Sequence, residues 1–176
     1  MALSDAKRAD YQAGLETGMG AILAALAGIN VVSGPGILDY LLTQSLEKLL
    51  LDHEACGMAL RLVRGVGQGA SESSAETVAL IEAVVAAGHF LSHPHTRKNF
   101  RDQLFIPGPA IDRGSHGAWE KRGAPSAFEA AAAEVKKILA RGNPAPLDDA
   151  LRRELDRLIS EDASRCGVEL PRHDDV

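Results

Sequence analysis

Residues 4–36 constrain the fold of this chain most, because they join a long helical pattern to a short apolar run. Ser4 and Asp5 carry side-chain oxygens that can accept hydrogen bonds from the free N–H groups of a first helical turn, so a helix is predicted to begin there. Gly28 is the natural end of that helix. Residues 29–33 then predict a buried strand, and the Gly-Pro-Gly that follows predicts a tight turn.

Three surfaces are predicted on this first helix. Residues spaced by three and four place polar side chains on one face: Asp5, Arg8, Gln12 and Glu16. An apolar stripe lies beside it: Leu15, Met19, Ile22, Leu23 and Leu26. A row of small residues lets another backbone approach closely, although each glycine costs about 1 kcal/mol of helix propensity: Gly14, Gly18, Ala21 and Ala25.

A single strand needs a partner, because its backbone groups must be hydrogen-bonded along at least one edge. No strand pattern precedes the first helix, and only Phe90-Leu91 offers a second, weak candidate. The pattern therefore indicates an α/β architecture entered partway through, of which this chain is a predominantly α-helical part with one or two short strands. A missing N-terminal portion is expected.

Four further helices follow from capping residues and apolar spacing. Ser45 is predicted to cap a helix to about Val63 that carries Lys48 and Asp52 as an i,i+4 pair. Two Ser-x-x-Glu capping boxes and one capping Asp start the others: Ser73 with Glu76, Ser126 with Glu129, and Asp148. Their core is predicted from large apolar side chains: Leu46, Leu49, Leu50, Leu60, Val63, Val78, Ile81, Val84, Val85, Phe128, Val135, Ile138, Leu139, Leu151, Leu155, Leu158 and Ile159.

The segments between these helices are predicted to be irregular. Residues 65–70 imitate a dinucleotide-binding loop, but they follow a helix rather than a strand, so a flexible connector is favoured. A short basic helix over residues 97–103, capped by Thr96, follows a histidine-rich linker. Residues 104–125 are rich in Gly and Pro, and they are expected to lie extended over a surface that large side chains anchor: Phe105, Ile106 and Trp119.

Composition limits the class of protein. The chain has 176 residues, 45% of them apolar, which is enough for one domain with a real core. Its net charge of −5 argues against a general nucleic-acid binder. Cys56 and Cys166 support neither a disulfide framework nor a cysteine zinc site, and no signal peptide is present, so a cytoplasmic location is expected. Residues 17–38 are uncharged, but their polar and turn residues argue against a membrane span.

Many residues, in order along nearly the whole chain, carry a family resemblance: Ser4-Asp5-Ala6-Lys7, Asp10, Gln12-Ala13-Gly14, Glu16, Ala24-Ala25-Leu26-Ala27-Gly28, Asn30, Ser45, Glu47-Lys48-Leu49, Leu51-Asp52, Glu54, Gly57-Met58, Arg64-Gly65, Gly88-His89-Phe90-Leu91, His93, His95-Thr96, Phe100-Arg101, Asp112-Arg113 and Trp119. In these positions the chain resembles the C-terminal part of the trimethylamine methyltransferase family, which includes glycine betaine:corrinoid methyltransferases.

The resemblance implies a C-terminal fragment of a (β/α)₈ TIM barrel followed by a helical extension. In that reading residues 1–70 supply the last barrel helix–strand–helix segment, with residues 31–32 on the eighth strand. Residues 71–165 form the helical C-terminal extension, and residues 166–176 form a polar, disordered tail.

The resemblance also implies a function: transfer of a methyl group from a methylamine or betaine to a corrinoid protein. The chain itself would bind no cofactor, because the partner protein carries the corrinoid, and it would be inactive alone. The alternative is a non-catalytic helical interaction subunit or remnant, which self-associates as a homo-oligomer or completes a barrel with a separate N-terminal barrel chain.

Two groups of side chains are candidates for substrate binding. His89, His93 and His95 lie within one short linker, where imidazoles can converge on a polar group, although such a loop often only hydrogen-bonds its own backbone, and the spacing is not a zinc signature. Gln12 and Glu16 share a helix face that the resemblance places near the barrel mouth, either to hold barrel geometry or to contact substrate. No catalytic residue and no metal ligand is assigned.

Two carboxylates and the aromatic content are less informative. Asp52 and Glu54 lie on adjacent sides of one predicted helix and cannot share a pocket unaided, so a solvated or ion-paired face is favoured over a site. A quaternary amine is best bound by several aromatic faces, and only 4% of this chain is aromatic. The chain alone therefore offers no evident cation cage.

Overall fold

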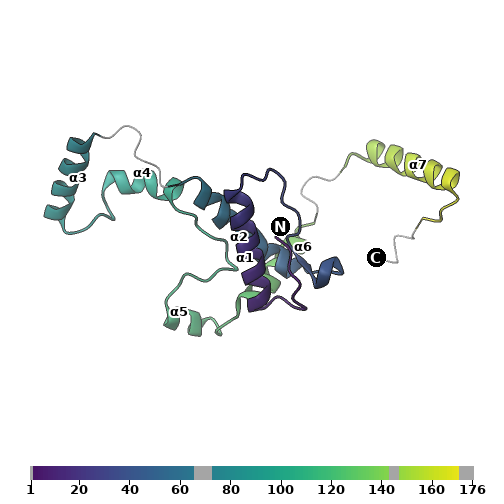
Figure 1. The fold of residues 1–176 in the computed structure, drawn as a ribbon, viewed down its shortest axis with the longest axis horizontal. Coiled ribbons are helices and arrows are strands. Elements are labelled where there is room, and N and C mark those ends of the chain that lie inside the picture. The colour runs from purple at the N-terminus through teal and green to yellow at the C-terminus, as the bar shows by residue number, and fades with distance from the viewer. Residues whose placement is uncertain (1, 66–72, 143–146, 171–176) are drawn as a thin grey trace. The chain divides into compact units, whose positions relative to one another are not determined.

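The computed structural model describes residues 2–65, 73–142 and 147–170, and these are mostly helical (Figure 1). Within those ranges the elements follow in this order: α1 (Tyr11–Leu26), β1 (Ile37–Leu38), the 3₁₀ turn η1 (Asp39–Leu41), β2 (Thr43–Gln44), α2 (Leu46–Val63), α3 (Ser74–Ala87), α4 (Pro94–Gln103), α5 (His116–Lys121), α6 (Ala127–Ala140) and α7 (Asp149–Cys166). The prediction of a predominantly helical chain is confirmed. The chain divides into two compact units, Met1–Ile138 and Leu139–Val176.

The first helix begins later than predicted. Asp10 is its N-cap, and its carboxylate accepts hydrogen bonds from the N–H groups of Gln12 at 3.0 Å and Ala13 at 3.4 Å. The predicted start at Ser4 is wrong because the buried Ser4 hydroxyl accepts from the N–H of Ala6 at 3.0 Å, and so forms a local turn instead. The predicted end is confirmed, since α1 stops just before Gly28, whose φ is +69°.

The strand predicted at residues 29–33 is wrong. Residues 31–34 have no regular structure, and the only strands in the described ranges are the two-residue hairpin β1–β2, where Ile37 pairs with Gln44 and Leu38 with Thr43. Part of the backbone of residues 29–33 is instead hydrogen-bonded to the N-terminal segment: the Ala2 N–H donates to the Ser33 carbonyl at 3.1 Å. Phe90-Leu91, the weak second candidate, lies in turns between α3 and α4.

Small side chains form the contact between α1 and α2. On α1 the buried positions are spaced by three and four: Ala13, Thr17, Ala21 and Ala24. On α2 the buried positions are mostly polar: Lys48, Asp52, Glu54 and Ala59. Of the predicted row of small residues, Ala21 is buried, but Gly14 and Gly18 have open space where a Cβ would lie, so the buried row is displaced around the helix.

Most of the large apolar side chains predicted as core are exposed. Val84 is buried, but many others are not: Leu46, Leu49, Leu60, Val63, Val78, Ile81, Val85, Phe128, Ile138, Leu139, Leu151, Leu155, Leu158 and Ile159. The buried apolar set consists mainly of alanines. Helical periodicity predicts which residues share an apolar face, but those residues are buried only if another element packs against that face. Among the described residues, such packing buries mainly alanines.

Four of the predicted helix caps are confirmed. Ser45, Ser73, Ser126 and Asp148 each accept hydrogen bonds from first-turn N–H groups, and both Ser-Glu pairs close reciprocally. In the unit Leu139–Val176, α7 ends at Gly167, whose φ is +67°. The connector over residues 65–70, apart from Gly65, and the tail beyond residue 170 lie outside the described residues.

One side of α2 is covered by residues 103–108, as expected for a segment lying over a surface. The Arg61 guanidinium donates to the Gln103 carbonyl at 2.9 Å, and Glu54 accepts from the N–H of Gly108 at 2.9 Å. Between them the Phe105 ring lies over Gly57. Phe105 is therefore an anchor, whereas Ile106 is exposed; Trp119 donates from its indole N–H to the Pro125 carbonyl at 2.8 Å.

Gly57→Ala is expected to lower the free energy of unfolding by about 1–2 kcal/mol, because a Cβ there would lie 2.5 Å from the Phe105 ring. In a Phe105→Leu background the same change should become stabilising by up to about 1 kcal/mol, since alanine favours the helix. Urea unfolding measures both. Gly18→Ala, mid-helix with no atom within 4 Å of the new Cβ, is the matched control. An equal gain at both glycines would contradict the contact.

Candidate functional site

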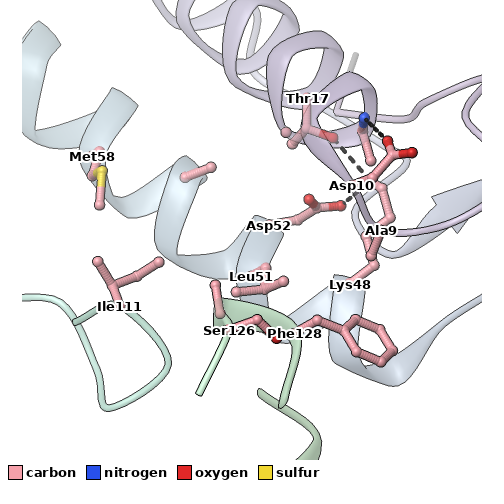
Figure 2. A pocket seen from close by; sticks show the side chains of 14 residues that line it. Ala9, Asp10, Thr17, Lys48, Leu51, Asp52, Met58, Ile111, Ser126 and Phe128 are labelled. Carbon is pink, nitrogen blue, oxygen red and sulfur yellow. Dashed lines mark hydrogen bonds and ion pairs between the residues drawn. The ribbon is translucent and has the colours of Figure 1, made fainter. Parts of the chain in front are cut away.

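A pocket of about 510 Å³ lies against the α1–α2 pair (Figure 2). Its lining comes from the residues just before α1 and its first half, the first two thirds of α2, the loop near residue 111 and the start of α6: Ala9, Asp10, Ala13, Gly14, Thr17, Lys48, Leu51, Asp52, Ala55, Met58, Ile111, Ser126, Ala127 and Phe128. The polar side chains Asp10, Thr17, Lys48 and Asp52 lie among apolar residues of α1 and α2, while Ile111 and Phe128 come from the other segments. This combination of a few convergent polar groups with apolar walls is typical of small-molecule pockets.

The polar side of the pocket is a buried ion pair. Lys48 and Asp52, one helical turn apart on α2, are 1% and 4% exposed, and the Lys48 Nζ contacts the Asp52 Oδ2 directly. Lys48 also donates to the hydroxyl of Thr17 on α1 at 2.9 Å. Asp52 accepts from the N–H of Gly36 at 2.7 Å. The cluster therefore connects α1, α2 and the turn before β1.

The sequence produces this cluster by simple means. The i,i+4 spacing places Lys48 above Asp52 on one face of α2, and Thr17 interrupts the alanine row of α1 with a hydroxyl. Gly36, at a φ of +83°, turns its N–H toward the carboxylate. All buried side-chain nitrogen and oxygen atoms among the described residues have hydrogen-bond partners. Each buried polar atom of the cluster thus has a partner within the chain, and the cluster positions α1, α2 and the turn before β1 relative to one another.

The rest of the pocket is not a complete catalytic site. Phe128 is its one aromatic side chain, and a cation cage needs several aromatic faces. Asp10 is a carboxylate at the pocket, but its Oδ1 accepts from the N–H groups of Gln12 and Ala13, and its Oδ2 pairs with Arg8. Within residues 2–65, 73–142 and 147–170, no three His, Cys, Asp or Glu side chains are grouped so that they could hold a metal ion.

The structure brings together the predicted pair Gln12 and Glu16. The Gln12 amide donates to Glu16 Oε1 at 2.8 Å, while Glu16 Oε2 accepts from the Ser4 hydroxyl at 2.6 Å and from the Asp5 N–H at 2.8 Å. The carboxylate therefore ties the N-terminal segment to α1. The Ser4 hydroxyl, then Gln12 and the Asp5 N–H, hold the Glu16 pKa below its ordinary value of 4.5.

Glu16→Gln is expected to reduce the loss of stability in acid. The charged carboxylate is favoured in the folded chain, so its contribution is complete above the unfolded pKa of 4.5 and is lost as the pH falls through the lower folded value. The melting temperature of the variant should lie below that of the parent at pH 7, and the two should converge as the pH falls through the lowered folded pKa. Parallel melting curves across this range would contradict the assignment.

The three histidines occupy different positions around the start of α4. His89 lies before it and is exposed; His93 is the N-cap, with its Nδ1 accepting from the N–H of His95 at 3.2 Å; and His95 is in the first turn. The predicted cap at Thr96 is wrong, because Pro94 starts the helix earlier. Neither of the two described pockets is lined by these residues. Their substrate role stays a prediction.

The carboxylates of α2 are more buried than the sequence predicts. Asp52 is ion-paired, as favoured, but it is buried rather than solvated, and Glu54 is buried at 6% exposure with the Gly108 N–H as its partner. Their predicted divergence is confirmed, since they reach different segments. Burial, followed by the charge of Asp52 one helical turn earlier, raises the pKa of Cys56, which makes its thiol a poor nucleophile.

A second hollow of about 550 Å³ lies around α5, which contains Trp119, and the segments on either side of that helix. Its charged members are Asp112, Arg113 and Arg122, of which Asp112 and Arg122 pair at 2.5 Å. The Gly114 N–H, and then Arg122, hold the Asp112 pKa below its ordinary value. Sequence reasoning missed this pair, because two residues ten apart in an irregular segment have no periodic signal.

No helix in the described part of the chain is both long enough and apolar enough to cross a membrane.

Comparison with known proteins identifies relatives of this chain. The model of the trimethylamine methyltransferase (MTTB) family matches residues 1–167. A glycine betaine methyltransferase of Desulfitobacterium hafniense (strain Y51) is 33% identical over 95% of this chain and 34% of its own length.

Two further relatives are trimethylamine methyltransferases. One, from Desulfitobacterium hafniense (strain DSM 10664 / DCB-2), is 31% identical over 93% of this chain and 32% of its own length. The other, from Methanosarcina barkeri, is 29% identical over 90% of this chain and 31% of its own length. The chain thus spans about a third of the length of these relatives. It belongs to the trimethylamine methyltransferase family.

Proposed function

We propose that this chain is the C-terminal segment of a cytoplasmic methyltransferase that moves a methyl group from a methylamine or betaine to a corrinoid protein. The observation that carries the proposal is the family match over residues 1–167, at one third of the relatives' length. In this proposal the segment belongs to the end of a (β/α)₈ barrel and its helical extension, with residues 1–70, 71–165 and 166–176 as barrel end, extension and tail. Alone, it is inactive.

In the proposed reaction the corrinoid protein accepts the methyl group, and this chain has a positioning role. The donor nitrogen would be quaternary or protonated, so that its bond to the methyl carbon breaks with the electron pair kept by the departing neutral amine, and the partner's corrinoid, in its reduced Co(I) state, would supply the electron pair for the new cobalt–carbon bond. This chain's own contribution is scaffolding: the Thr17–Lys48–Asp52 cluster fixes α1 against α2, and Glu16 fixes the N-terminal segment on α1. Such positioning groups hold a site in its productive geometry without touching the reacting atoms.

A second candidate function is a non-catalytic interaction subunit that self-associates as a homo-oligomer or completes a barrel with another chain. The large exposed apolar side chains on α1 and α2 favour it, because a stable soluble protein rarely leaves so many uncovered. Mass in solution and catalytic activity separate the two candidates.

The decisive experiment replaces the corresponding C-terminal third of the glycine betaine methyltransferase with this chain. The chimera and the isolated chain are each incubated with the reduced corrinoid protein and a betaine or methylamine, and methylation of the corrinoid is followed by its absorbance. We expect transfer by the chimera and none by the chain alone. A folded chimera inactive with every donor would contradict the enzyme proposal; transfer by the isolated chain would contradict its inactivity.

The histidine segment is tested in the same chimera. His89→Ala or His95→Ala is expected to lower methyl transfer with little change in melting temperature. His93→Ala is expected instead to lower stability by about 0.5–2 kcal/mol, because it removes the N-cap of α4, and His93→Asn should restore it. Equal activity per folded molecule in the His89 and His95 variants would remove them from the site.

A further inference from the structure

Two backbone segments, one before α1 and one after it, run side by side in the same direction. Their hydrogen bonds join residues in ascending order in both segments: the Ala2 N–H donates to the Ser33 carbonyl, the Ser4 N–H to the Ile37 carbonyl, and the Asp39 N–H to the Ala6 carbonyl, each at 3.1 Å. Parallel segments joined by a helix have their carboxyl ends at one edge, and in α/β folds ligands bind at that edge. Residues 5–7 and 39–41 therefore lie where a ligand site is expected.

The turn at the end of the second segment has an unfavourable backbone conformation. Asp39, Tyr40 and Leu41 have φ values of +49°, +52° and +76°, so three successive residues other than glycine lie in the left-handed region. This region is disfavoured for such residues because the Cβ atom comes too close to the following carbonyl oxygen. The N–H of Leu42 donates to the Asp39 carbonyl at 2.9 Å and closes the turn. Backbone strain of this kind is concentrated at active sites and ligand-binding sites.

The strained turn holds a cation between a carboxylate and an aromatic face. The Lys7 ammonium lies 2.8 Å from Asp39 Oδ1 and 4.8 Å from the centre of the Tyr40 ring. It also donates to the Asp5 carbonyl at 2.8 Å. The hydrogen bond to Asp39 raises the pKa of Lys7 above its ordinary value of 10.5, so this side chain is fully charged at neutral pH. A carboxylate beside an aromatic face is an arrangement that attracts alkylammonium ions.

The contact with Lys7 does not by itself account for the strained turn. The Lys7 and Asp39 side chains are 64% and 35% exposed, and exposed ion pairs contribute little to stability. Packing does not account for the turn either: Leu38 is the buried residue of the hairpin at 3% exposure, whereas Tyr40 and Leu41 are 67% and 63% exposed. The strain therefore presents a carboxylate and a ring to the surface, beside a backbone carbonyl, instead of building the core.

We propose that Asp39 and Tyr40 form one wall of a binding site for an alkylammonium ion, and that Lys7 competes with this ligand for the wall. The Lys7 ammonium stands in for the nitrogen of the ligand. In the enzyme the ligand is the ammonium group of the methyl donor, an assignment that rests on the proposed function. The carboxylate offsets the positive charge of the ligand, and the ring covers one side of its methyl groups.

The chain has two tyrosines, so the site can be observed directly. The tyrosine-labelled chain is titrated with tetramethylammonium chloride, the ring signals are followed by NMR, and sodium chloride at the same concentrations is the control. We expect a saturable shift of the Tyr40 signals. Tyr11, which begins α1 and is 82% exposed, is the internal control and should not respond. Equal shifts of both rings, or equal shifts in sodium chloride, overturn the proposal.

Three variants assign the contacts, with binding followed from the methyl signal of tetramethylammonium and folding checked by circular dichroism. Asp39→Asn and Tyr40→Asn remove the charge and the ring while placing asparagine, which tolerates a left-handed backbone, so each should weaken binding by at least about threefold. Lys7→Met removes the competing cation and should strengthen binding by at least about threefold. Unchanged affinity in both asparagine variants overturns the site, and unchanged affinity in Lys7→Met overturns the competition by Lys7.

The chimera with the glycine betaine methyltransferase separates this site from the proposed reaction. Asp39→Asn in the chimera should raise the KM for glycine betaine by at least about threefold and change kcat less, because it removes an interaction made with the bound substrate. Binding of tetramethylammonium by the chain, without methyl transfer by the chimera, contradicts the proposed function alone. Methyl transfer with an unchanged KM in the Asp39→Asn chimera contradicts the assignment of the wall to the methyl donor.

Discussion

Lys48→Met is expected to lower the free energy of unfolding by about 3–5 kcal/mol, because it leaves the buried Asp52 carboxylate without its cation. The methionine fills a similar volume, so the loss reports the charge rather than a cavity. Thr17 loses its hydrogen-bond donor at the same time. Urea unfolding of the purified chain, followed by circular dichroism, measures the change.

Two variants isolate the cause. Lys48→Met with Asp52→Asn should recover most of the loss, because the neutral amide oxygen still accepts from the Gly36 N–H. The same substitution at an exposed pair, Lys137→Met beside Glu134, should change stability by less than about 0.5 kcal/mol. A loss below about 1 kcal/mol for Lys48→Met would mean that water reaches Asp52 and that the pair is not buried.

The Lys48–Asp52 pair also shows what the sequence can and cannot predict. The pairing follows from spacing alone, because residues four apart on a helix always face the same way. The burial of the pair cannot be predicted from spacing, because it depends on contacts with α1 and with the turn at Gly36, which are distant in the sequence. The helix caps were predictable for the same reason as the pairing: Ser45 and Ser73 bond to groups within three residues.

Long-range partners caused the errors. The apolar run at residues 29–33 has the composition of a strand, but part of the backbone bonding around it comes from residues 2–6, about thirty positions earlier. Ser4 has the side chain of a helix cap, but its hydroxyl bonds Glu16 twelve residues away. Strand propensity is context-dependent, and such local preferences are overridden by tertiary contacts.

The same difference between local spacing and long-range contacts applies to the candidate site. Gln12 and Glu16 are brought together as their i,i+4 spacing predicts, and the substrate role of both remains a prediction. Of the buried polar residues at the pocket, Thr17 was missed because a threonine in an alanine row carries no distinctive motif, whereas Asp52 was considered and a solvated or ion-paired face was favoured over a site. Only the contact between α1 and α2 gives them a common location.

The turn before β1 is the second position where a large effect is expected. Gly36→Ala should lower the free energy of unfolding by about 2–4 kcal/mol, since a left-handed φ disfavours alanine and the turn's buried hydrogen bonds would be disturbed. The φ of Gly36 is +83°, and a Cβ would lie 2.9 Å from the Leu49 Cβ and 3.1 Å from the Ser45 carbonyl oxygen. The backbone cannot relax easily, because its carbonyl accepts from the Ser45 N–H at 2.9 Å.

Gly28→Ala separates crowding from backbone conformation. Gly28 also has a positive φ, +69°, but nothing lies within 4 Å of the point where a Cβ would be, so alanine there should cost only about 1–2 kcal/mol. Equal losses at both glycines would remove the crowding at Gly36. A double-mutant cycle completes the argument: Gly36→Ala and Lys48→Met share Asp52 as a partner, so their effects should be non-additive by about 0.5–3 kcal/mol. Strict additivity would mean that the turn and the ion pair are independent, and that Asp52 does not couple α2 to the segment leading into β1.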